Sequence, residues 1–280
     1  MRLEPRQIEA FKRNGFLAGL PLLSDDACTR FQQRTEAFEQ QYPDAAQWAF
    51  DIKANLLFDW VYEISVTSAL LDAVEDLIGP NILLTNSIFR IKPPGSNTHY
   101  GWHQDAARIQ VEPPFILAYL AISNATRANG CLRVIPGSHR TVEPFRLISY
   151  ACNRKVARTI DVDERLAVDL ILNKGEVALF HCNTIHGSGE NLSHRPRVAL
   201  INDYTPADAR QSTGTGSGQL VRGVNKATGF MSEKVPVGAF TLDNILARRR
   251  TLMRYPENVL MGPLESGEQP TFADDLPQSG

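Results

Sequence analysis

The sequence predicts a mainly β protein with flanking helices, whose core is a double-stranded β-helix, the cupin-like jelly roll. Between residues 82 and 204, short apolar segments rich in β-branched side chains follow one another at close intervals. Turns rich in proline and glycine separate these segments, as they do in antiparallel β architectures. Because no helical segment alternates with them, the pattern favours two stacked sheets over a βαβ fold.

The chain before these strands is expected to be helical. Residues 5–40 have amphipathic spacing, and Ser24 has the character of an N-cap that opens a second helix to about Glu39. Residues 67–78 repeat the helical period, and Gly79, which a proline follows, is a typical helix end. We therefore expect helices that pack on one sheet of the core.

Strands are expected wherever an apolar run lies between two turn signals. The five expected strands cover residues 82–92, 115–122, 131–135, 176–180 and 197–204. Residues 211–218 are rich in glycine, serine and threonine and are expected to form a mobile loop. Such a loop is either a solvated connection or a lid that closes over a site.

The chain is expected to form a single domain over residues 1–280, since neither a linker nor an internal repeat is found. Its helical N-terminal part is expected over about residues 1–80 and its jelly-roll core over about residues 81–205. A loop and helix extension is expected over about residues 206–280. The length is sufficient to bury one sizeable core.

The composition limits the classes of partner. A formal net charge of -2 gives no general attraction to nucleic acid or to acidic membranes. The four cysteines form no C-x-x-C pair, and neither a signal peptide nor a long apolar run is found. These features predict a cytoplasmic protein with reduced thiols, which binds a small molecule rather than a membrane or nucleic acid. They leave the oligomeric state open.

A group of metal-ligand residues is the most informative feature of the chain. His103 and Asp105 are two positions apart, so on an extended segment both side chains face the same side. With His186 from a distant strand, they would form a 2-His-1-carboxylate site, which holds Fe(II) and leaves positions open. His181 is the rival distal ligand, but its place on a predicted strand favours a structural role. The alternative for the pair alone is a surface histidine beside a solvated aspartate.

In order, these residues resemble the phytanoyl-CoA dioxygenase family of Fe(II)/2-oxoglutarate oxygenases, over roughly residues 50–205. The resemblance is highly specific as an ordered set, although each piece is weak alone. The motifs that carry it are Gly79-Pro80-Asn81-Ile82, Lys92-Pro93-Pro94, Trp102-His103-Gln104-Asp105, Asn129 to His139, His186-Gly187-Ser188-Gly189-Glu190-Asn191 and Arg197.

The resemblance implies a role for each matching residue. It implies that His103, Asp105 and His186 ligate iron. It also implies that Arg197 pairs with the C5 carboxylate of 2-oxoglutarate, for which a planar guanidinium is well suited. Ser188 resembles the hydroxyl partner of that carboxylate.

Three further residues match family positions near the cosubstrate. The resemblance implies that Gln104 contacts the cosubstrate, that Tyr119 lines the pocket and that Lys53 approaches the cosubstrate. The alternative for each of these residues, and for Ser188, is ordinary packing or solvent contact. Asn129-Gly130 and the turn before His139 are interpreted as turn chemistry rather than catalysis.

The expected function is therefore that of an Fe(II)/2-oxoglutarate-dependent dioxygenase. With O2, it would hydroxylate or otherwise oxidise an unactivated C–H bond of a small metabolite, in specialised metabolism, and release succinate and CO2. Halogenating relatives replace the carboxylate ligand with a small residue, so the presence of Asp105 favours hydroxylation.

Three alternatives stay open. The same chemistry could act on an acyl-CoA or carrier-bound substrate, which the basic cluster at Arg248 to Arg250 would suit. A keto-acid-independent cupin-type metal enzyme would use the three ligands without needing Arg197. A binding protein without catalysis would be expected to have lost a ligand.

Overall fold

The computed structural model describes residues 1–107, 111–150, 155–211, 216–226 and 229–254. Its helices are α1 (Pro5–Asn14), α2 (Asp25–Gln41), α3 (Pro43–Asp51), α4 (Asp59–Ser65), α5 (Ser68–Ile78) and α6 (Leu242–Leu252). Five short 3-10 helices, η1 to η5, lie in the connections. Within this part of the chain, no helix is both long and apolar enough to span a membrane.

The strands form one large sheet, one smaller sheet and two short pairs. The large sheet has the order β1 (Phe16–Pro21), β10 (Glu176–His181), β5 (Ile116–Ala121), β12 (Arg197–Pro206), β2 (Ile82–Lys92), β14 (Gly216–Arg222) and β15 (Phe230–Ser232). The smaller sheet has the order β3 (Tyr100–His103), β11 (His186–Ser188), β6 (Leu132–Val134) and β9 (Val168–Leu170). The pairs are β13 (Arg210–Gln211) with β4 (Val111–Glu112), and β7 (Arg146–Tyr150) with β8 (Lys155–Thr159).

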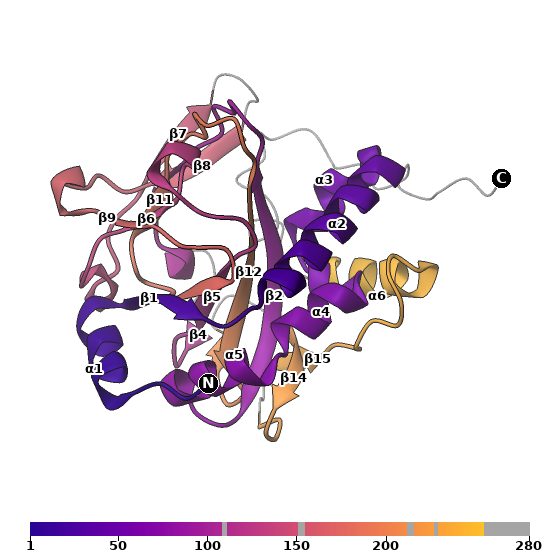
Figure 1. Cartoon of the computed structure of the whole chain (residues 1–280). Coiled ribbons are helices and arrows are strands. Elements are labelled where there is room, and N and C mark those ends of the chain that lie inside the picture. Colours follow the sequence, from indigo (N-terminus) through magenta and orange to yellow (C-terminus); the bar gives the residue numbers. More distant parts are fainter. Residues whose placement is uncertain (108–110, 151–154, 212–215, 227–228, 255–280) are drawn as a thin grey trace.

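The two sheets and the helices make a layered jelly roll, as the sequence predicts. Among the described residues, every strand pair is antiparallel except β14 with β15. Figure 1 shows α2, α3, α4 and α6 on one side of the large sheet, with β6, β9 and β11 on the other. The large sheet is therefore the middle layer, and both of its faces are covered.

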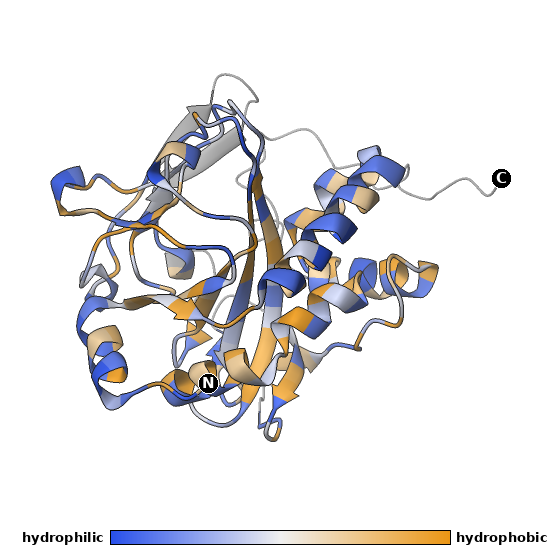
Figure 2. Cartoon of the chain, in the orientation of Figure 1, coloured by the Kyte–Doolittle hydropathy of each residue, from blue (hydrophilic) through white to orange (hydrophobic). Residues whose placement is uncertain are grey.

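Strand β5 shows why its sequence is a continuous apolar run. Ile116, Ala118 and Leu120 belong to the core between helices and sheet. The intervening Leu117 and Tyr119 belong to the core between the two sheets. Successive side chains point to opposite faces, so a strand covered on both faces has no solvated position. Figure 2 shows hydrophobic residues along the strands of the large sheet, and both hydrophobic and hydrophilic residues on the helices beside it.

Helix α5 and strand β2 form where the sequence predicts them. Helix α5 ends at Gly79, which has a φ of 90°, a conformation that glycine adopts without strain. Strand β2 covers all of residues 82–92 and pairs with β12 along most of its length. The other four expected strands are found within one or two residues of their predicted ends.

The expectation of helix throughout residues 5–40 is wrong between α1 and α2. Gly15, with φ 83°, ends α1 in the left-handed conformation, and β1 then pairs with β10. Leu17 and Leu20 of β1 are buried in the core. The pairing partner comes from more than 150 residues away, so no local pattern reveals this strand.

Two further boundaries need correction. Helices α3 and α4, between residues 40 and 67, were not among the predicted elements. The expected loop at 211–218 is half strand, because Gly216, Ser217 and Gly218 begin β14 and are buried in the large sheet; residues 212–215 lie outside the described residues. The large sheet therefore extends beyond residues 81–205 at both ends of the chain.

Candidate active site

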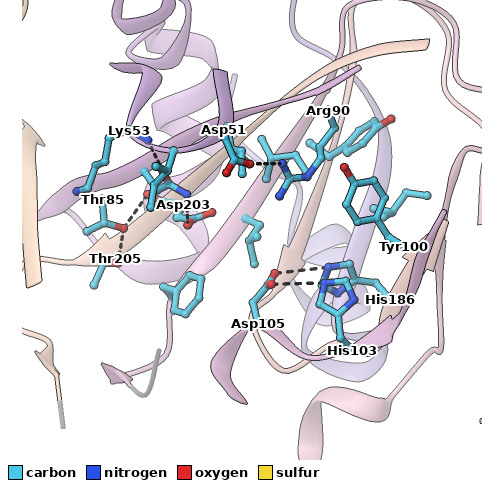
Figure 3. Close-up of a pocket in the computed structure, with 18 of the residues that line it drawn as sticks. Asp51, Lys53, Thr85, Arg90, Tyr100, His103, Asp105, His186, Asp203 and Thr205 are labelled. Carbon is cyan, nitrogen blue, oxygen red and sulfur yellow. Dashed lines mark hydrogen bonds and ion pairs between the residues drawn. The ribbon is translucent and has the colours of Figure 1, made fainter. Parts of the chain in front are cut away.

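A pocket opens between the two sheets of the jelly roll. Its walls come mainly from β2, β5 and β12 of the large sheet and from β3 and β11 of the smaller one. Figure 3 shows polar side chains at two separate places in it, with His103, Asp105 and His186 on one side and Thr85, Asp203 and Thr205 on the other. Ile88, Leu117 and Ile201 are among the apolar residues of its wall.

His103, Asp105 and His186 meet in this pocket. His103 and His186 lie opposite each other in the antiparallel pair of β3 and β11. Asp105 begins the turn after β3, where its backbone N–H donates to the carbonyl of Cys182 at 3.0 Å. One possible ligand atom from each residue lies within 4.8 Å of the others, and in the described part of the chain this is the only such group of three or more.

The two imidazoles are oriented by backbone hydrogen bonds. Nδ1 of His103 donates to the carbonyl of Gly101 at 2.7 Å, and Nδ1 of His186 donates to that of Thr184 at 2.9 Å. Because a carbonyl can only accept, each Nδ1 carries the proton and each Nε2 has a free lone pair. These Nε2 atoms lie 3.6 and 3.5 Å from the carboxylate oxygens of Asp105.

The electrostatics of the site suit a divalent cation. Burial and the neighbouring His186 lower the pKa of His103, against the attraction of Asp105, so the ring is neutral at ordinary pH. A neutral imidazole is the form that binds metal. Two imidazole nitrogens and one carboxylate oxygen on one side of a space make the donor set of a mononuclear iron site with open positions.

The rival histidine takes no part in this group. The Nδ1 atom of His181 accepts from the backbone N–H of Asn183 at 3.0 Å, and its ring lies beside that of His139 at 5.4 Å. Its backbone N–H donates to the carbonyl of Gly15, which ties β10 to the end of α1. His181 is thus a structural residue, as the sequence favours.

A buried cationic group lies next to the metal-ligand residues. Arg197, at the start of β12, is only 2% exposed. Its Nη1 donates to the carbonyl of Gly130 at 2.7 Å, and its guanidinium carbon lies 5.8 Å from the ring centre of Tyr119. The turn at Gly130 needs glycine, since its φ is 71° and a Cβ there would lie 2.3 Å from the carbonyl oxygen of Gly189.

Two polar atoms at this place lack partners. Nε of Arg197 and the hydroxyl of Tyr119 are buried without a hydrogen bond in the described structure. Buried polar groups are rarely left unpaired unless a ligand or water completes them. Both residues line the pocket, as does Ser188. The residues present therefore fit the distal carboxylate of a keto acid.

Lys92 supplies a second buried cation that the sequence analysis did not single out. Its Nζ donates to Oγ of Ser188 at 2.8 Å and to the carbonyl of Gly189. Burial and the nearby charge of Arg197 lower the pKa of Lys92 to about 7. An anion bound here would favour the protonated lysine. Its position in the Lys-Pro-Pro motif, at the end of β2, was the available signal.

Gln104 does not line the pocket, contrary to expectation. Its Nε2 donates to the carbonyls of Thr141 (2.8 Å) and Asn183 (2.5 Å), and its Oε1 accepts from the N–H of Glu143 at 2.9 Å. The alternation that turns His103 and Asp105 into the pocket turns the residue between them away from it. Gln104 thus anchors the segment around residues 138–143.

Lys53 lines the pocket, but its ammonium is already paired. Its Nζ donates hydrogen bonds to Oε1 of Glu233 at 2.5 Å and to the carbonyl of Ser217 at 3.0 Å. Ser217 belongs to β14 and Glu233 directly follows β15, and both are more than 160 residues away in the sequence. Lys53, directly before the 3-10 helix η1 (Ala54–Leu56), thus ties this segment to β14 and to the residue after β15. Lys92 is the lysine beside Ser188 and Arg197.

Asp203 is the second functional candidate that the sequence analysis missed. It is buried on β12 and lines the pocket away from the metal-ligand residues. Burial and the charge of Asp105 raise the pKa of Asp203 to about 7, although a hydrogen bond from Asn86 opposes the shift. A carboxylate inside a predicted apolar strand was the signal that could have identified it.

Comparison with known proteins gives one family. A model of the family described as phytanoyl-CoA dioxygenase (PhyH) matches residues 11–199. The peroxisomal phytanoyl-CoA dioxygenase of Rattus norvegicus is 26% identical over 249 residues, which are 78% of this chain and 72% of that protein. A probable alpha-ketoglutarate-dependent hypophosphite dioxygenase of Stutzerimonas stutzeri is 30% identical over 172 residues, which are 58% of this chain and 59% of that protein.

A solved structure agrees over a longer stretch. The apo form of the non-heme monooxygenase ThoJ superposes with a TM-score of 0.80 at 26% identity, over 89% of this chain and 95% of that one. The likeness thus extends over most of both chains.

Proposed function

The chain belongs to the phytanoyl-CoA dioxygenase (PhyH) family of Fe(II)/2-oxoglutarate-dependent oxygenases, and from this we propose that it hydroxylates a free small molecule. Its cofactor is Fe(II), and its cosubstrates are 2-oxoglutarate and O2. When bound, iron and keto acid together activate O2 for attack on an unactivated C–H bond, with release of succinate and CO2. The residues of the chain provide binding, orientation and exclusion of water.

We assign the iron ligands to His103, Asp105 and His186. The observation that carries the assignment is the convergence of their ligand atoms within 4.8 Å, in a pocket beside a buried guanidinium. The backbone carbonyls that hold both Nδ1 protons keep the rings in the orientation that ligation needs. Asp105 and His103 remain about a quarter exposed toward the pocket, which leaves a side open for the other ligands.

We assign the distal carboxylate of 2-oxoglutarate to Arg197, with Tyr119 and Ser188 as hydrogen-bond partners. The unpaired Nε of Arg197 and the unpaired hydroxyl of Tyr119 support this placement. Lys92, through its bond to Ser188, adds a positive charge at the same place. A keto-acid-independent metal enzyme would leave these buried cations without an anion, so we do not favour it.

A free metabolite of specialised metabolism is our preferred substrate. The basic cluster at Arg248 to Arg250 is smaller than its sequence indicates, because Arg248 is buried and donates to the carbonyls of Ile52 (2.9 Å) and Trp48 (2.8 Å). Only Arg249 and Arg250 remain exposed for a CoA group. The name of the Stutzerimonas relative gives a small free substrate for that protein. In the described chain, Cys28, Cys131 and Cys182 are buried free thiols, which supports the predicted cytoplasmic setting.

An acyl-CoA substrate is the second candidate, because the mammalian relatives are named for phytanoyl-CoA. The two candidates differ in a simple assay. A CoA thioester that stimulates 2-oxoglutarate decarboxylation, when the matching free acid does not, would favour the second candidate.

Anaerobic optical titration tests the proposed function directly. Purified apoprotein receives Fe(II) and then 2-oxoglutarate, and the expected result is a visible charge-transfer band that needs both additions. His186→Ala should abolish the band and Arg197→Ala should weaken it. A well-folded wild-type protein that binds Fe(II) but gives no band would overturn the assignment of the keto-acid site.

A further inference from the structure

The pocket contains a second polar place, which the iron and keto-acid sites do not use. We call it the acidic end; it comprises Thr85 and Asn86 of β2 and Asp203 and Thr205 of β12. Figure 3 shows Thr85, Asp203 and Thr205 across the pocket from His103 and His186. The counterpart, the iron end, comprises the three metal-ligand residues with Tyr119, Ser188 and Arg197, together with Lys92, which is not part of the lining but donates to Ser188.

A single strand connects the two ends. Arg197, Ile201, Asp203 and Thr205 occupy alternate positions of β12 and all line the pocket. Asp203 is six residues beyond Arg197, which is about 20 Å at the rise of an extended strand. The keto-acid anchor and the acidic end are therefore held at a set separation by one rigid element.

A β-bulge shapes the acidic end. The pairing of β12 with β2 shifts register after Asp203, so that Thr85 is the extra residue of β2. Its Oγ1 donates to the backbone carbonyl of Asp203 and lies 3.1 Å from Oγ1 of Thr205. Bulges are frequent beside active sites because they redirect side chains. Here the bulge brings two hydroxyls next to each other at the backbone of Asp203.

The Asp203 carboxylate is held but not fully satisfied. Its Oδ2 accepts from Nδ2 of Asn86 at 3.2 Å, and Oδ1 of Asn86 accepts from the backbone N–H of Lys53 at 2.9 Å. Lys53 has a φ of 56°, so the chain turns sharply to make this bond. No donor to Oδ1 of Asp203 is found among the described residues. The side chain is only 8% exposed.

The charges around Asp203 leave the acidic end short of a cation. Lys53 is paired with Glu233 at 2.5 Å. Arg90 lies 3.7 Å from Asp51, an exposed carboxylate that also lines the pocket. Each of these two cations has a carboxylate partner of its own, although both still attract Asp203 and oppose the rise of its pKa. Burial and Asp105 raise its pKa to about 7, which shows that the cavity alone stabilises the negative charge poorly.

We propose that the acidic end binds a cationic nitrogen of the substrate, with Asp203 as counter-ion and Thr85 and Thr205 as neighbouring polar groups. The oxidised carbon would lie toward the iron end. This inference rests on the proposed function and adds a substrate class to it, namely a basic amine or a related cationic nitrogen compound. A polyanionic CoA ester would offer no cation to Asp203.

Binding of simple probes tests the substrate class. The probes are hexylamine, which is protonated at pH 7.5, 1-hexanol and hexanoate, each added anaerobically to the complex of protein, Fe(II) and 2-oxoglutarate. The readout is a shift of the charge-transfer band, with thermal stabilisation of the apoprotein as a second measurement. We expect hexylamine to bind about 10- to 100-fold more tightly than 1-hexanol, as a buried charge-assisted hydrogen bond requires. Hexanoate should not bind.

Two isosteric variants make the test specific. Asp203→Asn removes the charge and keeps the shape, and it should abolish the preference for hexylamine. Asp208→Asn removes a charge from an exposed residue outside the pocket and should preserve that preference. Equal binding of amine and alcohol by the wild type, or an unchanged preference in Asp203→Asn, would overturn the proposal.

The outcomes separate this inference from the proposed function. If the wild type forms the charge-transfer band but shows no amine preference, only the substrate class is wrong. If no band forms but the amine stabilises the apoprotein in an Asp203-dependent way, the acidic end stands and the keto-acid assignment fails.

Discussion

The two ends of the pocket are built from the same two strands but carry opposite charge. At the iron end, β2 and β12 supply Lys92 and Arg197, both buried. At the acidic end, the same strands supply Asn86 and Asp203. Burial lowers the pKa of Lys92 to about 7 and raises that of Asp203 to about 7. Each end therefore lacks one counter-charge, and two ligands of opposite charge would satisfy both.

This difference indicates how one cavity can keep two ligands in order. A keto-acid dianion is attracted to the iron end and repelled by Asp203. A cationic substrate has the opposite preference. The arrangement would orient the substrate before any contact with iron. Substitutions at each end can test the two sites separately.

Removal of an iron ligand should abolish the activity that depends on the iron end. His186→Ala should lower 2-oxoglutarate turnover by roughly a thousandfold or more, because the metal loses one of three protein ligands. His181→Ala is the matched control, since His181 lies outside the ligand group; it should keep the charge-transfer band. Asp105→Gly should likewise lose most oxygenation. Wild-type turnover in either His186→Ala or Asp105→Gly would refute the ligand assignment.

Substitution of Arg197 should remove only the binding partner of the distal carboxylate of the keto acid. Arg197→Met should raise the Kd for 2-oxoglutarate by roughly 100-fold, as expected when a buried charged hydrogen-bond partner is removed. Binding of pyruvate, which has no distal carboxylate, should change much less. Titration of the charge-transfer band with both keto acids measures this. A parallel loss for both would mean that the substitution disturbs the site as a whole.

Lys92 should make keto-acid binding depend on pH. The free protein holds Lys92 with a pKa of about 7, and only the protonated form attracts an anion. Above pH 7, the affinity for 2-oxoglutarate should therefore fall, at most about tenfold per pH unit. Lys92→Met should bind more weakly at pH 6.5 and show a nearly flat profile from pH 7 to 9. An identical slope in both proteins would assign the titration to another group.

Asp203 should make the free energy of unfolding depend on pH. The pKa of Asp203 is raised to about 7 in the folded protein. Between the usual pKa of an aspartate and pH 7, the folded state therefore keeps a proton that the unfolded state has released. The contribution of Asp203 to the free energy of unfolding should thus decrease by about 1 to 3 kcal/mol as pH rises from 4 to 7.

Urea denaturation of the apoprotein at several pH values measures this contribution as a difference between variants. Asp203→Asn should lack it, so its stability should gain on that of the wild type as pH rises from 4 to 7. The exposed control Asp208→Asn should follow the wild type. If Asp203→Asn also runs parallel to the wild type, Asp203 does not titrate in this range.

Local pattern was sufficient for several parts of the fold and the site. The spacing of His103 and Asp105 places both on one side of an extended segment, and the structure keeps them there. Gly79 ends α5, and the apolar run after it is β2 to the residue. Period and turn chemistry act over a few residues, so a single sequence displays them.

Other features depend on segments far apart in the chain. Strand β1 exists because β10 pairs with it. The amide of Gln104 binds three backbone groups from two distant segments, at Thr141 and Glu143 and at Asn183. Lys53 faces Glu233, 180 positions away. No local pattern contains these partners. The resemblance to a family places Lys53 at the pocket, which it lines, but it indicates neither the pairing of Lys53 with Glu233 nor the backbone partners of Gln104.

By itself, the sequence determined the class of chemistry, since the types and order of the ligand residues already indicate iron and a keto acid. Only the tertiary structure decided which lysine accompanies Arg197 and that a buried carboxylate, Asp203, lies at the other end of the same pocket. The physical reason is that charge and burial act through space. Lys92 and Asp203 acquire their unusual pKa values from sheet packing, which sequence spacing does not record.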